Sequence, residues 1–158
     1  SQRGRRDGLV ADKLLDEWLD EVLAGKVPDE LILDVLDAAE ARADAPKQSA
    51  PASLKQKVEK YRSAQAKLAE AKDGDKLAPY REALAGGDAA RGRSVFLNNA
   101  AVYCQRCHKL DGQGGDVGPQ LNGLAADKDK DRRYLLESLV LPNAKIAKGY
   151  ETVILLLN

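Results

Sequence analysis

The residues of this chain that could do chemistry are gathered in one short segment. The sequence contains two cysteines and one histidine among 158 residues, and all three lie within YCQRCHK, residues 103–109. Cys104, Cys107 and His108 form the pattern Cys-x-x-Cys-His. Random placement of three such rare residues would seldom produce this spacing, so the segment is the candidate functional site.

Three kinds of chemistry use two thiols at this spacing, and two of them also use the imidazole. In covalent haem attachment the thiols add across the two vinyl groups of the porphyrin, and the histidine becomes an axial ligand of the iron. A structural zinc ion would need a fourth ligand, which only Asp or Glu could supply in this chain. A dithiol redox pair needs no histidine, and the thioredoxin-like βαβ context is absent. The pattern favours one haem c per chain, with His108 as the proximal iron ligand.

The segment after the motif supports a flat cofactor. It is rich in glycine, at positions 112, 114, 115, 118 and 123, and glycine lets the backbone pass close to a macrocycle. The Pro119 carbonyl can accept a hydrogen bond from Nδ1–H of His108, which would fix the tautomer and raise the basicity of the ligand. We therefore assign Gly118, Pro119 and Leu121 to the cofactor-binding surface, although Gly-Pro is also compatible with a plain turn.

Helices are predicted for most of the first half of the chain. Apolar residues recur there at helical spacing, and glycine, proline and acidic residues mark the helix ends. The predicted helices are 9–23, 28–43, 52–72 and 77–84, with a linker at 45–53. Residues 1–76 form a helical region that could be the end of a helical-repeat array plus a linker.

The character of the sequence changes after Gly87. Asp88 is suited to cap a helix that runs through Phe96, and DRRYLLESLVL at 131–141 predicts a further helix. The final run ETVILLLN, 151–158, predicts a strand. A single strand needs a partner, which a second chain could provide by pairing along the strand edge. The predicted fold class is mainly α with a short β segment at the C-terminus.

Composition narrows the classes of function. The chain has 25 basic and 25 acidic residues, and neither half has the basic excess of a nucleic-acid-binding protein. No apolar run approaches the ~20 residues of a membrane span. The first residues, SQRGRRDG, lack the apolar region of a signal peptide, so we expect that one was removed or that the chain is an excised piece. The chain has only one Trp, one Phe and five Tyr, so few aromatic side chains are available for the core, and an apolar cofactor could help to fill it.

The motif and its flanks resemble class I cytochromes c. GDAARGRSVF at 87–96 is similar to the N-terminal helix of that family, in which the positions of Gly92 and Phe96 pack against a C-terminal helix. Three longer segments, LAPYREALAGGDAARGRSVF, CQRCHKLDGQGGDVGPQLNGLA and YLLESLVLPNAKIAKGYETVILLLN, look like the Pirellula/Verrucomicrobium-type haem-binding domain. This resemblance covers residues 77–158 and implies a cytochrome c-like haem domain there.

The resemblance implies electron transfer through one covalently bound haem c. Domains of that kind end large proteins that also carry a dehydrogenase-like β-propeller and helical repeats, so the expected partner is a redox protein or a dehydrogenase domain. We find no second group of catalytic residues and expect no enzymatic activity from this chain itself. Haem is attached to Cys-x-x-Cys-His outside the bacterial cytoplasm, so the expected location is the periplasm or the outer face of a membrane.

The sequence departs from the family on the distal side of the haem. Class I cytochromes usually have a distal methionine, and this chain has no methionine and no second histidine. In the subgroup the methionine follows an insertion of β structure, so the domain is expected to be incomplete at its C-terminal end. Substitute ligands would be Lys145, Lys148 or Tyr150. An open distal site would instead suit a haem enzyme or a gas-binding sensor, to which Arg132 or Arg133 could contribute.

Overall fold

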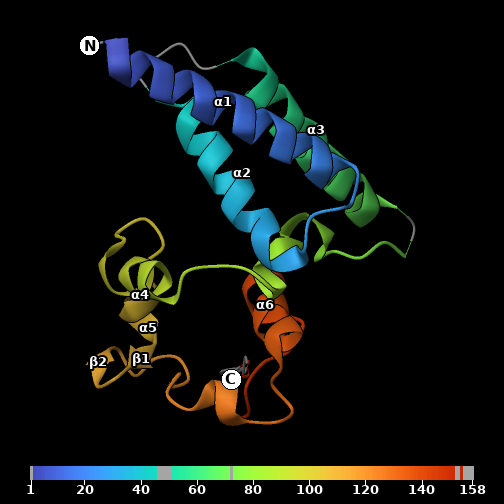
Figure 1. Ribbon diagram of the computed structural model, residues 1–158. Coiled ribbons are helices and arrows are strands. Elements are labelled where there is room, and N and C mark those ends of the chain that lie inside the picture. Colours follow the sequence, from blue (N-terminus) through green and yellow to red (C-terminus); the bar gives the residue numbers. More distant parts are fainter. Residues whose placement is uncertain (1, 46–50, 72, 152–153, 155–158) are drawn as a thin grey trace. The chain divides into compact units, whose positions relative to one another are not determined.

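The structure is a computed structural model, and it describes residues 2–45, 51–71, 73–151 and 154. The chain is mainly helical, as predicted, and divides into two compact units, Ser1–Gly87 and Asp88–Asn158 (Figure 1). We call them the N-terminal unit and the C-terminal unit and describe each by itself. Among the described residues, no helix is long and apolar enough to cross a membrane.

The N-terminal unit is built from three α-helices and one 3₁₀ helix. Helices α1, α2 and α3 pack against one another, and η1 packs against α2 and α3 (Figure 1). Their bounds are Gln2–Leu23 for α1, Asp29–Ala43 for α2, Ala52–Glu70 for α3 and Ala78–Leu84 for η1. The four predicted helices are confirmed, and α1 begins seven residues earlier than the apolar periodicity indicated.

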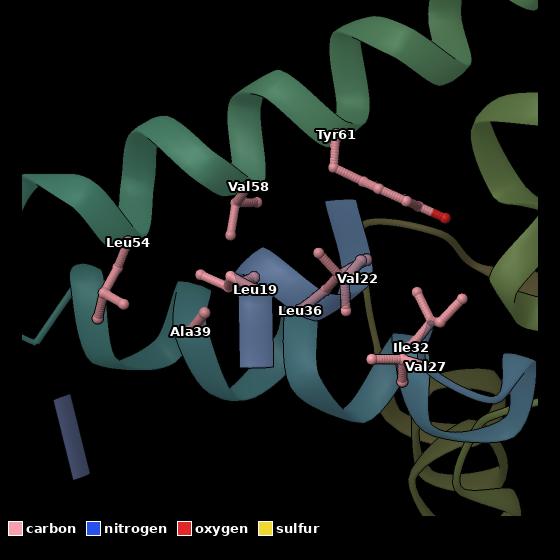
Figure 2. Close-up of a cluster of buried hydrophobic side chains, with 9 residues drawn as sticks. All are labelled: Leu19, Val22, Val27, Ile32, Leu36, Ala39, Leu54, Val58 and Tyr61. Atoms are coloured by element: carbon pink, nitrogen blue, oxygen red, sulfur yellow. The ribbon is translucent and has the colours of Figure 1, made fainter. Parts of the chain in front are cut away.

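One leucine from each α-helix is fully buried where the helices meet. Leu19, Leu36 and Leu54 are at most 1% exposed, and the surrounding apolar side chains complete the core (Figure 2). Burial of each leucine contributes about 2 kcal/mol to the free energy of unfolding. The apolar stripes predicted for α2 and α3 face this core, whereas Leu14 and Trp18 of α1 lie toward solvent.

Ion pairs join the helices around this core. Arg42 of α2 holds Asp12 of α1 with an Nε–Oδ1 distance of 2.7 Å, and both side chains are largely buried. Lys57 of α3 lies 2.8 Å from carboxylate oxygens of both Asp16 and Asp20. The hydrogen bond from Lys57 holds the pKa of Asp16 below its ordinary value.

Segment 77–87 packs with the N-terminal unit. Leu77 and Ala78 are buried, and the buried Glu82 accepts a hydrogen bond from Arg62 of α3 at 3.2 Å. A Cβ atom on Gly86 would lie 3.1 Å from the Leu33 side chain of α2. The sequence resemblance placed the domain boundary after residue 76, whereas the compact units divide after Gly87.

The C-terminal unit consists of short elements joined by turns. It contains α4, Ala89–Asn98; α5, Cys104–Cys107; the strands β1, Lys109–Leu110, and β2, Gln113–Gly114; η2, Leu124–Ala126; and α6, Arg132–Val140. The helices predicted at 88–96 and 131–141 are confirmed within two residues at each end. None of the described residues of this unit is buried, so its apolar side chains form no closed core among themselves.

The predicted C-terminal strand falls mainly on residues that the structure does not describe. Residues 152–153 and 155–158 lie outside the described residues, and Glu151 and Ile154 have no regular secondary structure. The β structure that is described is a hairpin of β1 and β2, which the sequence analysis did not predict. Lys109 pairs with Gly114 and Leu110 with Gln113.

Candidate functional site

Both cysteines lie on α5, a single helical turn. Tyr103 precedes it with a left-handed φ of 50°, and the amide of His108 closes it by donating to the Cys104 carbonyl at 3.0 Å. Residues three apart on a helix lie on the same face, so Cys104 and Cys107 present their thiols to one side. Both are free thiols and partly buried.

The imidazole of His108 is held by the residue that the sequence predicted. The Nδ1 atom of His108 lies 2.8 Å from the carbonyl oxygen of Pro119. A carbonyl oxygen only accepts hydrogen bonds, so Nδ1 must carry the proton and donate. The lone pair of the neutral ring therefore lies on Nε2, the atom that remains for a metal ion.

Gly118 packs its backbone directly against the same ring. A Cβ atom added to Gly118 would lie 2.8 Å from Cε1, 3.0 Å from Nδ1 and 3.2 Å from Nε2 of His108. Its amide donates to the carbonyl of Cys107 at 2.7 Å, which fixes the loop against α5. The absence of a side chain at this position is thus required by the approach to the imidazole.

The hairpin makes an equally close contact with the backbone of α5. A Cβ atom on Gly114 would lie 2.1 Å from the carbonyl oxygen of His108, and one on Gly115 would lie 2.2 Å from that of Arg106. The Gly115 amide donates to Gln105 at 2.9 Å. These two glycines, like Gly118, serve close packing around the motif.

Leu121 belongs to the loop that returns to the motif. Its amide donates to the carbonyl of Lys109 at 3.0 Å, and its side chain is partly buried. The structure therefore brings Leu121, Pro119 and Gly118 to the Cys-x-x-Cys-His segment. Their role in binding a cofactor stays a prediction.

Sequence reasoning missed a polar cluster beside this loop. Asn122 Nδ2 donates to Asp111 Oδ1 at 2.6 Å, and the Asp111 amide donates to Asn122 Oδ1 at 2.9 Å. Arg93 of α4 donates to the other carboxylate oxygen of Asp111 at 2.5 Å. The hydrogen bonds from Arg93 and Asn122 hold the pKa of Asp111 below its ordinary value. The Asp111-Gly112 turn dipeptide was the available signal for this hairpin.

The three candidate distal ligands lie after α6 and are exposed. The ammonium group of Lys145 forms an ion pair with Glu137 and lies 4.9 Å from the centre of the Tyr134 ring. The amide of Tyr150 donates to the Ala147 carbonyl at 3.0 Å, closing a turn that contains Lys148. In the described residues, the Lys145 side chain is thus engaged within its own segment.

The zinc alternative depends on how the metal-donor side chains are grouped. Among the described parts of the chain, no group of three or more His, Cys, Asp and Glu side chains is placed to hold a metal ion. A tetrahedral zinc site would need four such donors around one point. The described side chains thus offer two thiols and one imidazole nitrogen, without an assembled zinc-ligand set.

A surface pocket of about 600 Å³ lies elsewhere, in the N-terminal unit. Leu14, Trp18, Val27 and Pro28 provide its apolar lining. The acidic residues at its edge form ion pairs with lysines of the same unit, Glu17 with Lys13, Asp20 with Lys57 and Glu21 with Lys26. The pocket therefore has no uncompensated acidic surface for a cationic partner.

Comparisons with known proteins give no match for this chain. No family model, no curated protein and no solved structure matches it.

Proposed function

We propose that the C-terminal unit binds one haem c covalently and transfers electrons through it. Cys104 and Cys107 would be the attachment residues, and Nε2 of His108 would be the proximal iron ligand. The observation that carries this proposal is the 2.8 Å contact between His108 Nδ1 and the Pro119 carbonyl, on a ring that directly follows both thiols. When bound, the haem would supply an iron centre that takes up and releases one electron.

The side chains of the motif suit covalent attachment. Each thiol would add across one vinyl group: sulfur bonds to one carbon, the thiol hydrogen goes to the other, and no oxidant or leaving group is needed. Because the two cysteines share one face of α5, they can reach two vinyl groups on the same edge of a porphyrin. Both cysteines are free thiols in the structure, as this addition requires.

The surrounding residues would hold and tune the ligand. Donation from Nδ1 to Pro119 fixes the tautomer and makes Nε2 a stronger electron donor. Gly118 allows the loop to pack flat against the ring. The apolar side chains of this unit are exposed or partly buried, and a porphyrin face would give them an apolar surface to pack on. A class I cytochrome c-like arrangement is consistent with these features.

The wider role follows from the chemistry of the proposed group. An electron-transfer module needs a donor and an acceptor, so we propose that the chain works with a redox partner protein or a dehydrogenase domain. We place it in the periplasm or at the outer face of a membrane, because haem is attached to this motif outside the bacterial cytoplasm. The balanced overall charge gives no support to nucleic acid as the partner.

A second candidate function is supported by the distal side. The chain has no methionine and one histidine, and the Lys145 ammonium group is engaged by Glu137 and Tyr134. These observations favour an open sixth iron position in this chain. Such a site would bind small molecules such as carbon monoxide, nitric oxide or peroxide, as a sensor or an enzyme does.

Absorption spectroscopy tests both candidates on the full chain, produced together with a bacterial haem-attachment apparatus. Spectra of the oxidised, reduced and carbon monoxide-treated protein would be compared with those of a Cys104→Ala/Cys107→Ala variant. Haem that stays with the denatured wild-type polypeptide, but not with the variant, supports covalent attachment. A low-spin spectrum unchanged by carbon monoxide favours electron transfer, and rapid uptake favours the open site. A polypeptide without haem bands refutes both.

A further inference from the structure

We propose that Asp111 and Asn122 form a clamp that positions the His108 imidazole by holding the Pro119 carbonyl against it. The inference rests on the proposed function of His108 as the iron ligand. Asp111 lies three residues after His108, and Asn122 lies three residues after Pro119. The clamp therefore joins the same two chain segments as the His108–Pro119 hydrogen bond, three residues further along each.

Two reciprocal hydrogen bonds make the clamp specific. Asn122 donates from its amide nitrogen to Asp111 Oδ1, and its Oδ1 accepts from the Asp111 backbone amide. Both contacts span eleven residues, as the contact between His108 and Pro119 does. Between them, Leu121 donates its amide to Lys109. The loop is thus fastened to the motif at three successive points, and the clamp is the outermost.

The conformation of Asp111 places both its amide and its carboxylate in the clamp. Asp111 and Gly112 have φ values of 51° and 78°, the left-handed pair that a tight hairpin turn requires. A non-glycine residue in this region costs free energy, and it persists where surrounding contacts hold it. Here Asn122 supplies two of those contacts, and Arg93 of α4 supplies a third through the second carboxylate oxygen.

Loss of the clamp would act on the imidazole through Pro119. The loop would retain the Leu121 amide hydrogen bond but lose the hydrogen bonds between Asp111 and Asn122. The Pro119 carbonyl would then move away from Nδ1 of His108. A weaker bond at Nδ1 makes the imidazole a poorer electron donor, which raises the reduction potential of a bound haem. The Asp111 side chain is about half exposed and Asn122 is exposed, so both contribute modestly to folding, and the effect is on ligand position rather than on stability.

Nuclear magnetic resonance of the ¹⁵N-labelled full chain tests the clamp directly. His108 is the sole histidine, so its ring signals need no further assignment. Exchange of the Nδ1 proton with solvent should be roughly tenfold faster in Asp111→Ala and in Asn122→Ala, as expected when about 1.4 kcal/mol of protection is lost. Asp111→Asn keeps an oxygen for Asn122 and the backbone donor, so it should restore most of the protection.

Asp127→Ala is the matched control. Asp127 is also a partly exposed aspartate, paired with Lys130 at 2.9 Å and with a lowered pKa, but it lies outside the clamp. Its removal should leave ring-proton exchange unchanged. In the haem-loaded protein, the reduction potential should rise in the two alanine variants of the clamp and stay unchanged in Asp127→Ala.

The outcomes separate this inference from the proposed function. If the chain takes up no haem, the proposed function fails, and ring-proton exchange still decides whether the clamp holds the imidazole. If haem is attached but exchange and potential in Asp111→Ala and Asn122→Ala equal those in Asp127→Ala, the clamp is refuted while the haem site stands. Faster exchange in the clamp variants together with a raised potential supports both.

Discussion

The carbonyl oxygen of Pro119 lies 2.8 Å from Nδ1 of His108, eleven residues earlier in the chain. This contact assigns the two ring nitrogens different roles, because a carbonyl can only accept the Nδ1 proton. It leaves Nε2 as the basic atom of a ring that follows two free thiols in the sequence. This assignment supports the proposal that haem would bond to the two sulfur atoms and to Nε2.

Replacement of Gly118 by alanine tests this arrangement. The new Cβ atom would lie 2.8 Å from Cε1 of His108, closer than side chains tolerate, so either the ring or the loop must move. We expect Gly118→Ala to destabilise the haem-loaded C-terminal unit by about 1–3 kcal/mol, as overpacking does. The measurements are haem content per chain and thermal unfolding followed at the haem absorption band.

Gly92→Ala is the control for this substitution. Gly92 lies within α4, and a Cβ atom there meets nothing within 4 Å. Alanine also favours helix more than glycine does, so this variant should retain its haem and be at least as stable as the wild type. Equal haem content and stability in Gly118→Ala and in Gly92→Ala would contradict the close approach of Gly118 to the imidazole.

The helices were predictable because their side chains repeat at helical spacing. In α3, Leu54, Val58 and Tyr61 form one stripe, and the structure buries all three. The first seven residues of α1 were not predicted, since they are mostly polar and show no such stripe. Local periodicity thus indicates which helices exist, while their ends depend on capping and on the exposed flanks.

The candidate site was predictable only in part. The contact between His108 and Pro119 could be predicted, because a histidine that binds a metal through Nε2 usually donates its Nδ1 proton to an acceptor such as a carbonyl oxygen. The pairing of Asp111 with Asn122 has no periodic signal in the sequence. It depends on the conformation of a hairpin with two-residue strands, which brings together two side chains that are eleven residues apart in the chain. Strands this short carry no apolar alternation, so the hairpin could only have been inferred from its Asp-Gly turn.

Substitution of Asp12 tests the ion pair inside the N-terminal unit. Asp12→Asn would remove the carboxylate charge from the largely buried pair of Asp12 and Arg42. We expect the free energy of unfolding of this unit to fall by about 1.5–3 kcal/mol, as when a hydrogen bond between charged groups is weakened. Urea unfolding followed by the fluorescence of Trp18, the sole tryptophan, measures this unit separately.

The comparison for this prediction is Lys13→Ala, which removes an exposed pair. Lys13 lies 3.7 Å from Glu17, and both side chains are more than half exposed. Because solvent screens such pairs, the free energy of unfolding should change by less than about 0.5 kcal/mol. Equal losses in Lys13→Ala and Asp12→Asn would show that burial does not strengthen the pair of Asp12 and Arg42.

The raised pKa of Tyr61 predicts that the free energy of unfolding of the N-terminal unit falls at alkaline pH. Burial raises the pKa of Tyr61 to about 12 from an ordinary value of 10.0, with a smaller contribution from Glu82. The folded state thus keeps the phenol proton that the unfolded state loses above pH 10. The contribution of protonated Tyr61 to the free energy of unfolding is complete below pH 10 and is lost as the pH rises toward 12.

Tyr61→Phe removes this titration and should flatten the alkaline fall in stability. The measurement is urea unfolding at pH 9 and pH 11.5, again followed by Trp18 fluorescence. The wild type should lose more stability between these pH values than the variant does. Lys57, whose pKa is also raised by its aspartate partners, is present in both proteins and cancels in the comparison. Parallel losses in the two proteins would contradict a raised pKa for Tyr61.

The position of the boundary between the units gives a final prediction, about segment 77–87. A polypeptide of residues 1–87 should unfold with the same midpoint in urea as the N-terminal unit of the full chain, whereas residues 1–76 should be less stable by about 2–4 kcal/mol. The shorter polypeptide loses the buried Leu77 and leaves Arg62 without Glu82.

In the full chain, Leu77→Ala should lower the free energy of unfolding of the N-terminal unit, and Tyr80→Ala, at a residue 51% exposed, should not. Equal stability of the two polypeptides would place the boundary after residue 76.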